Sequence, residues 1–137
     1  MRARLAFPKP EKRSATKRRR DRADVAEAQR VREKCVDRDG YCRLGFPISV
    51  EKLSVVGMCG GPSEWMHLGA KKRAHTRGMA PEERHTTSYS MMGCRGHHHA
   101  YDQGKLAILG LSAEMADGPL RFERNGRTYD EPERRRA

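Results

Sequence analysis

The sequence of 137 residues lacks any run of about 20 apolar residues, the length that a membrane-spanning helix requires. Its first residues, Met1 to Leu5, carry positive charge, but no apolar stretch follows them, so the sequence predicts no secretory signal. Both absences favour a cytoplasmic protein without membrane contact. In that reducing compartment, cysteines that occur together with histidines bind metal more often than they form disulfides.

Apolar side chains are also scarce, at 36% of the chain beside 34% charged residues. The length allows one domain with flexible ends, and the composition allows it only a lean hydrophobic core. Small domains of this kind depend on disulfides, a metal or a partner to stay folded. The chain contains four cysteines, Cys35, Cys42, Cys59 and Cys94, so a metal is the expected stabiliser.

Negative charge is the third shortage, because 29 Lys and Arg residues face only 18 Asp and Glu residues, which gives a net charge of +11. Most of this excess lies in residues 1–22, which hold ten basic and two acidic residues. Residues 1–21 lack apolar periodicity, and we expect them to form a disordered basic tail. Such a tail raises affinity for nucleic acid without sequence selectivity, although it could also serve solubility or contact ribosomal RNA.

Apolar spacing and turn residues predict an α+β domain over residues 22–130, followed by a frayed end at 131–137. In chain order the expected elements are a helix over 22–36 that ends near Gly40, irregular chain over 41–59, a strand over 64–68, a long loop over 69–86, a return strand over 90–92, a helix over 97–109 and a hairpin over 122–129. The hairpin rests on Asn125-Gly126, the strongest two-residue turn signal.

Three cysteines and a histidine form a candidate zinc site. Two residues separate Cys94 from His97, the spacing of a zinc knuckle, which lets both side chains reach one ion from a tight turn. Cys42 and Cys59 would supply the other two ligands, and zinc would then tie the start of the fold to the helix that follows the return strand. Unrelated buried thiols are the alternative. Cys35 falls in the first helix, where a core thiol is expected.

A second polar cluster contains His98 and Asp102, which lie four apart on the same predicted helix. This spacing points both side chains to one side, where they can hold a divalent ion. His97 projects about 100° away from His98, so one helix could serve zinc on one face and a second metal on the other. Spacing alone cannot separate adjacent histidines, so His98 could also be the zinc ligand. Glu64-Trp-Met-His67 opposes this cluster from upstream.

Residues 36–102 resemble the HNH endonuclease family, whose ββα-metal fold pairs a hairpin with a helix around one metal. The resemblance rests on three segments in this order: Arg38-Asp-Gly-Tyr-Cys42, Glu64-Trp-Met-His67 and Cys94-Arg-Gly-His97-His98. Three more segments are similar to small HNH proteins of bacteriophages: Pro62-Ser-Glu-Trp65, Thr76-Arg-Gly-Met-Ala-Pro-Glu-Glu-Arg-His85 and His98-His-Ala-Tyr-Asp102. The fold that this implies is a small zinc-stapled ββα-metal domain with an N-terminal helix and a C-terminal hairpin.

The resemblance also implies roles for individual residues. His67 would be the general base that activates water against a phosphorus atom of DNA, and His98 and Asp102 would hold a catalytic Mg²⁺ or Mn²⁺. The structural Zn²⁺ would be separate from that ion. A further implication, by family analogy alone, is a setting in phage DNA packaging beside a phage terminase, in the cytoplasm of the host cell.

Two positions depart from the family pattern. Met66 stands where many members have Asp or His as another metal ligand. The family's middle Asn holds the loop to the hairpin, and by position Tyr89 replaces it. His85 is the nearest residue that is chemically suited to this bracing role, and it is therefore the second candidate catalytic residue beside His67. The catalytic ion could therefore recruit His75 or Glu64 as an additional ligand.

The loop over 69–86 carries the candidate DNA-binding residues Arg73, Arg77 and Arg84. Their planar guanidinium groups suit phosphate oxygens, and a merely solvated loop is the alternative. The leading functional hypothesis is a DNA endonuclease. A non-catalytic zinc module that binds DNA or RNA is the second hypothesis, and a small RNA-associated structural protein is the third.

Overall fold

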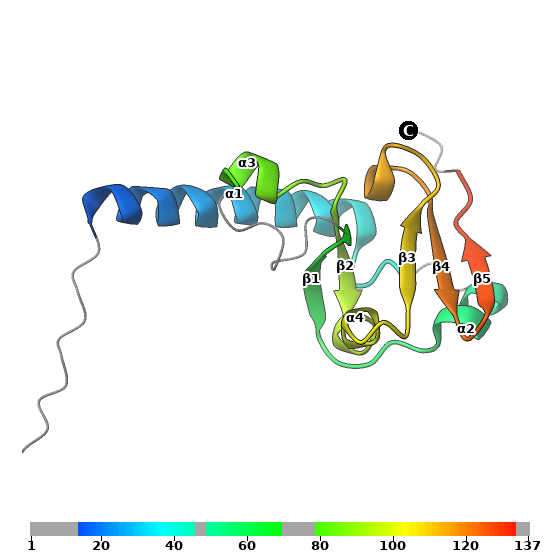
Figure 1. Cartoon of the computed structure of the whole chain (residues 1–137). Coiled ribbons are helices and arrows are strands. Elements are labelled where there is room, and N and C mark those ends of the chain that lie inside the picture. Colours follow the sequence, from blue (N-terminus) through cyan, green and yellow to red (C-terminus); the bar gives the residue numbers. More distant parts are fainter. Residues whose placement is uncertain (1–13, 46–48, 70–78, 134–137) are drawn as a thin grey trace, which may run out of the picture.

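The computed structural model describes residues 14–45, 49–69 and 79–133, and within them it shows an α+β fold with an N-terminal helix and a C-terminal sheet (Figure 1). The elements, in chain order, are α1 (Ala15–Asp39), α2 (Val50–Val56), β1 (Ser63–His67), α3 (Pro81–Arg84), β2 (Ser90–Cys94), α4 (Arg95–Asp102), β3 (Ala107–Gly110), the 3₁₀ helix η3 (Met115–Asp117), β4 (Leu120–Arg124) and β5 (Arg127–Asp130). The predicted α+β class is confirmed. None of the described helices has the length and apolar character needed to cross a membrane.

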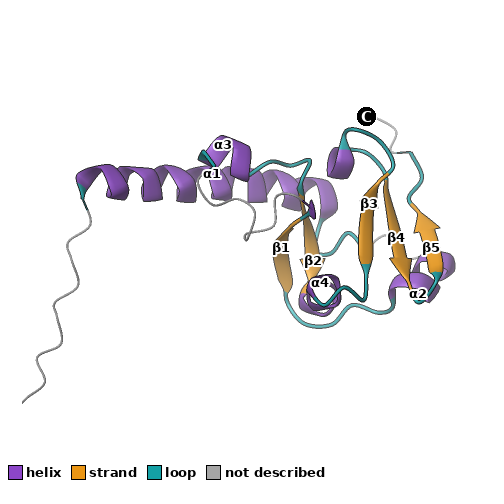
Figure 2. Ribbon diagram, in the orientation of Figure 1, coloured by secondary structure: helices purple, strands orange, loops and turns teal. Residues whose placement is uncertain are grey.

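The strands form two antiparallel sheets (Figure 2). In the first sheet β1 pairs with β2, so that His67 lies opposite Ser90 and Ser63 lies opposite Cys94. The second sheet has the order β3-β4-β5, with Asn125-Gly126 in the turn between its last two strands. The predicted strand, return strand and C-terminal hairpin are therefore confirmed. The hairpin gains a third strand, β3, that the sequence pattern did not predict.

The β1–β2 hairpin lies between α1 and α4. On one face Trp65 packs against a small cluster made by Val31, Cys35 and Met92. The next residue of β1, Met66, faces the opposite side, as alternation along a strand requires, and is fully buried in the main core. Because the hairpin is covered on both faces, its edges and the strand ends are the places where it can present polar side chains.

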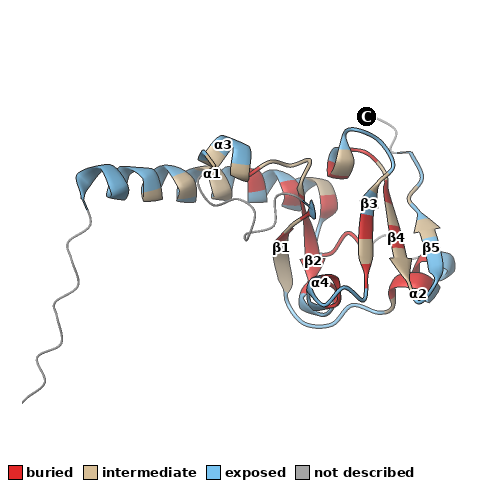
Figure 3. Ribbon diagram, viewed as in Figure 1, coloured by how far each residue is buried: buried red, intermediate tan, exposed pale blue. Residues whose placement is uncertain are grey.

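The N-terminal part of α1 extends beyond the body, and its side chains from Ala15 to Arg20 are exposed (Figure 3). Its buried residues are Val31, Cys35 and Asp39, all in the second half of the helix. The predicted start of this helix at residue 22 is wrong by seven residues. Ser14 caps it, because its side chain accepts a hydrogen bond from the Lys17 N–H at 3.2 Å, and the arginines and alanines that follow have high helix propensity.

Two further predictions about helices are wrong. Chain 41–59 is not irregular throughout, because Ser49 caps the seven-residue helix α2, whose Val55 and Val56 are buried. The predicted helix over 97–109 starts earlier, at Arg95, and stops at Asp102. Gly104 follows α4 with a φ of +74°, in the left-handed region that glycine adopts without strain. The turn at Gly104 lets the chain continue as β3, just as Gly40, with a φ of +72°, ends α1.

A buried ion-pair network fastens the end of α1 to the C-terminal sheet. Arg43 is fully buried, and its Nη2 lies 2.7 Å from Oε1 of Glu131, while Nη1 lies 3.6 Å from Oδ1 of Asp39. The Glu131 carboxylate also accepts the N–H of Leu120 at 2.9 Å. Glu131 is therefore held in place, and the prediction that fraying begins at residue 131 is wrong. Residues 134–137 lie outside the described ranges.

Candidate metal centre and histidine cluster

Four side chains from separate parts of the chain meet in one group. Cys42 follows α1, Cys59 follows α2, Cys94 caps α4 and His97 lies in its first turn. The ligand atoms of these residues all lie within 4.8 Å of one another. The Nδ1 atom of His97 is 3.5 Å from Sγ of Cys42, 3.9 Å from Sγ of Cys59 and 3.1 Å from Sγ of Cys94. These separations bracket the edge of about 3.6 Å that zinc bond lengths give in a tetrahedron.

The orientation of His97 suits a ligand. Its Nε2 atom lies 3.0 Å from the carbonyl oxygen of Val56 and 3.1 Å from that of Gly57. Nε2 must therefore carry the proton that it donates to these carbonyls, which leaves the lone pair of Nδ1 directed at the three sulfurs. A hydrogen bond of this kind to the other ring nitrogen is usual for metal-ligating histidines.

The sulfurs are arranged as thiolates would be. Sγ of Cys94 accepts the N–H groups of Gly60 and His97, each at 3.4 Å. Burial of the sulfur, and then the neighbouring thiols of Cys42 and Cys94, raise the pKa of Cys59 to about 12. Without a cation the thiol of Cys59 therefore stays protonated at neutral pH, whereas a bound metal ion deprotonates a coordinating thiol.

Close packing around the cluster fits the same conclusion. A Cβ atom at Gly45 would lie 2.2 Å from Sγ of Cys59, so only glycine leaves room for that sulfur. The structure thus brings together the four residues that the sequence predicted, and this group could hold a structural metal such as zinc. Cys35 is not among them. It is fully buried beside Ser90, and its expected role as a core thiol is confirmed.

The second group of interest is a chain of three polar side chains on the α1 side of the hairpin. Nε2 of His67 lies 3.2 Å from Nδ1 of His85, and Nε2 of His85 lies 3.0 Å from Oδ1 of Asp24. The ring of Trp65 packs against both imidazoles, with centroid distances of 4.4 Å to His67 and 5.4 Å to His85. His85 therefore contacts His67 of the hairpin from the segment that follows the loop.

The environment keeps His67 neutral. Burial is the main cause that lowers its pKa, and electrostatic interactions with His85, His98 and Arg84 lower it further, to about 4. At neutral pH the imidazole therefore carries one proton and one free lone pair.

His98 lies between two carboxylates on α4 and β1. Its Nδ1 is 3.4 Å from Oε2 of Glu64, and its Nε2 is 3.4 Å from Oδ2 of Asp102. Because these are different edges of the ring, Glu64 does not join Asp102 around a common point. Glu64 is held by Arg95 at 3.0 Å, so its carboxylate is fixed beside Nδ1 of His98, while Nε2 faces Asp102.

The donor set of this pair fits a weakly held divalent ion, with one imidazole nitrogen and one carboxylate oxygen side by side. Within the described ranges, however, the only group of three or more possible ligands is the Cys42, Cys59, Cys94 and His97 cluster. Met66, in the position where a further ligand was considered, is buried in the core. His75 lies outside the described residues.

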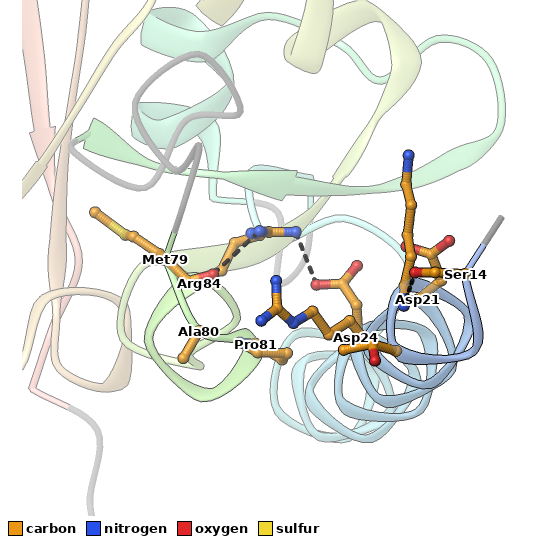
Figure 4. A pocket seen from close by; sticks show the side chains of 10 residues that line it. Ser14, Asp21, Asp24, Met79, Ala80, Pro81 and Arg84 are labelled. Atoms are coloured by element: carbon orange, nitrogen blue, oxygen red, sulfur yellow. Dashed lines mark hydrogen bonds and ion pairs between the residues drawn. The ribbon is translucent and has the colours of Figure 1, made fainter.

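The arginines predicted to contact DNA are partly accounted for. Arg73 and Arg77 lie outside the described residues. The guanidinium of Arg84 forms an ion pair with Asp24 at 2.8 Å and donates to the carbonyl oxygen of Met79 at 3.1 Å. This pair borders a pocket of about 720 Å³ between the first half of α1 and α3, which Lys17 and Arg20 also line (Figure 4).

Sequence reasoning missed Asp24. It stands 61 residues before His85, within a helix of alternating charges, and no local motif distinguishes it from its neighbours. Only the packing of α1 against α3 and the hairpin reveals its partner. Comparison with known proteins adds nothing to this geometry: no family model matches the chain, and neither do curated proteins or solved structures.

Proposed function

We propose that this protein is a metal-dependent DNA endonuclease of the HNH type, which hydrolyses phosphodiester bonds. The observation that carries the proposal is the position of His67. It is a neutral imidazole at the end of β1, braced by His85, while His98 and Asp102 lie side by side on α4. Phosphodiester hydrolysis needs a base for the attacking water and a cation for the leaving oxygen, and this arrangement offers a residue for each.

In the proposed reaction, His67 removes a proton from the water that attacks the phosphorus. Its Nε2 is engaged with His85, so Nδ1 is the nitrogen that takes the proton. His98, oriented by Glu64, and Asp102 hold the divalent ion, Mg²⁺ or Mn²⁺. When bound, that ion stabilises the charge on the phosphate and on the departing 3′ oxygen.

The Cys42, Cys59, Cys94 and His97 group is proposed to hold a structural Zn²⁺ rather than a catalytic one. All four positions are filled by protein ligands, which is typical of a structural site, whereas a catalytic site keeps one position open. The zinc would fix the N-terminus of α4 against the ends of α1 and α2. It would thereby set the position of His98, the residue that follows the ligand His97.

The proposal is tested with the purified protein and supercoiled plasmid DNA. We expect conversion to nicked or linear DNA when Mg²⁺ or Mn²⁺ is present, and none when a chelator is added. The chelator must be of a kind and concentration that leaves the zinc content unchanged, as elemental analysis can verify. DNA that stays supercoiled with every divalent ion, while it binds the protein, would contradict the proposal.

One observation favours the second hypothesis, a non-catalytic zinc module that binds nucleic acid. Met66 is buried in the core, and the described residues supply only two ligands for a catalytic ion. Binding without cleavage in the plasmid experiment is the result that this hypothesis predicts. A phage terminase remains a partner that only the family resemblance suggests.

DNA is the proposed partner of the basic N-terminal half of α1. Five exposed basic residues lie on this part of the helix: Lys17, Arg18, Arg19, Arg20 and Arg22. The helix carries them away from the body (Figure 1), where a polyanion can reach them without disturbing the core. These five charges lie on helix α1, whereas the sequence analysis assigned the first four of them to a disordered tail.

Replacing these five residues together with Gln should weaken DNA binding and flatten its salt dependence. Gln retains helix propensity, so the change removes charge and little else. Each phosphate contact contributes about 0.9 to the slope of log K against log salt, so the magnitude of the slope should fall by up to about 4.5 when all five contacts are lost. Fluorescence anisotropy at several salt concentrations measures it. The matched control replaces Arg32 and Lys34, exposed on the same helix, and should leave the slope nearly unchanged. An unaltered slope in the fivefold variant would place the contacts elsewhere.

A further inference from the structure

Three elements contribute one residue each to a continuous hydrogen-bonded chain that ends at the proposed general base. Asp24 comes from the middle of α1, His85 caps the C-terminus of α3, and His67 is the last residue of β1. The two links measure 3.0 Å and 3.2 Å between heavy atoms. His85 is buried, with 7% of its surface exposed, so water does not compete freely for its ring nitrogens.

The chemistry of Asp24 fixes the direction of its hydrogen bond with His85, and the charge of His85 then decides the direction of the second link. Asp24 forms an ion pair with Arg84 and is therefore a carboxylate, which accepts hydrogen bonds but cannot donate them. Nε2 of His85 must then be the donor to Asp24. When His85 is neutral, its other nitrogen is an acceptor, and Nδ1 of His85 then accepts from Nε2–H of His67. His67 is left with its lone pair on Nδ1.

We propose that Asp24 is a positioning residue, which acts through His85 to hold His67 in the tautomer that has a free Nδ1. The inference rests on the proposed function, because a general base needs a lone pair at the nitrogen that faces water. Without the carboxylate, both imidazoles could reverse, and the proton of His67 would then occupy Nδ1. That form cannot accept a proton from water at the same atom.

The surroundings of the chain support a positioning role. The ring of Trp65 lies against both imidazoles and restricts their planes. Arg84 holds the carboxylate of Asp24 from the α3 side, as Figure 4 shows. Helix α1 therefore contributes more than its basic residues: it places the carboxylate of Asp24 where it accepts a hydrogen bond from His85, next to the β1–β2 hairpin.

Nuclear magnetic resonance of the zinc-loaded full chain tests the inference without reference to activity. Long-range proton–nitrogen correlations distinguish a protonated ring nitrogen from an unprotonated one. We expect the proton on Nε2 in both His67 and His85 of the unaltered protein. A proton on Nδ1 of His67 would overturn the inference, whatever the protein proves to do.

Three variants locate the cause. Asp24→Asn keeps the shape but can donate as well as accept, so the ring signals of His67 and His85 should move toward a mixture of tautomers. Asp37→Asn makes the same change at an exposed position of α1 and should leave those signals in place. Arg84→Gln removes the ion pair but retains the carboxylate, and should preserve the Nε2–H tautomers. Unchanged signals in Asp24→Asn, or equal changes in Arg84→Gln, would overturn the assignment.

The kinetic consequence is separate from the tautomer measurement. If the protein cleaves DNA, Asp24→Asn should lower kcat about 10²-fold with KM nearly unchanged, within the range that general-base catalysis contributes. Asp37→Asn should cleave at the parental rate. A protein that never cleaves would refute the proposed function, while the tautomers would still decide the role of Asp24. A parental kcat in Asp24→Asn would refute the positioning role alone.

Discussion

Replacing Cys94 with Ser is expected to remove the bound zinc and to unfold the body of the protein. Cys94 ends β2, caps α4 and places its sulfur 3.1 Å from Nδ1 of His97, so its loss affects the hairpin, the helix and the ligand group together. Zinc binding contributes about 10–16 kcal/mol in small zinc domains, as much as or more than the whole stability of a typical domain, about 5–15 kcal/mol. The lean core of this chain makes it especially dependent on that contribution.

The measurement combines zinc content with thermal unfolding. We expect one zinc per chain in the unaltered protein, and little zinc and no cooperative transition in Cys94→Ser. Cys35→Ser is the matched control, because it makes the same chemical change at a buried thiol outside the ligand group. It should retain zinc and lose only about 1–3 kcal/mol of stability, the cost of an imperfectly paired buried polar group. Reduced, folded protein without zinc would refute the structural metal.

The ligand group could be predicted from the sequence because its signals are local. Cys94 and His97 sit at knuckle spacing, and any fold that places them in one turn brings their side chains together. Both hairpins were predicted for a similar reason. Apolar residues mark strands β1 and β2, and Asn125-Gly126 marks the turn between β4 and β5. Spacing could not assign His97 and His98, however. The structure separates them, because only His97 turns its Nδ1 toward the sulfurs.

Other elements depend on tertiary contacts that the sequence does not display. Helix α2 is short and rich in Val, which favours strands, and its Lys52 is buried with its ammonium 5.6 Å from the ring of Phe122. Strand β3 follows a turn at Gly104 and is defined by pairing, for example of Ile108 with Phe122. In both cases the partner is a strand of the C-terminal sheet, and for α2 that sheet lies far along the chain, so local propensity does not decide the structure.

The distance in sequence also explains why the histidine chain was only half predicted. The sequence indicated that His85 braces the site near His67, because it stands close to the position of a bracing residue in the resembling family. Asp24 gave no such signal. The position of Asp24 depends on how α1 packs against the body. That packing is set by buried residues about two to four turns further along the helix, such as Val31 and Asp39.

The second large effect is expected from His67 and His98, which should fail in different ways. His67→Ala removes the proposed base but no metal ligand, so cleavage should fall by about 10²–10⁴-fold while metal and DNA affinities stay nearly constant. His98→Ala should lose cleavage together with divalent-ion binding, and excess Mn²⁺ should restore part of it. Asp102→Ala should resemble His98→Ala more mildly, because mass action can still fill a weakened site. Plasmid cleavage and Mn²⁺ titration measure both properties.

Two neighbours on α4 provide the controls for this pair. His99→Ala alters an exposed side chain whose Nε2 contacts Gln103 at 2.8 Å, and it should cleave at the parental rate. His97→Ala should lose zinc, whereas His98→Ala should keep it, because Nδ1 of His97 is the nitrogen that faces the three sulfurs. The opposite pattern of zinc loss would exchange the two histidines. Parental cleavage by His67→Ala would rule out His67 as the base, since no rate can depend on a proton acceptor that has been removed.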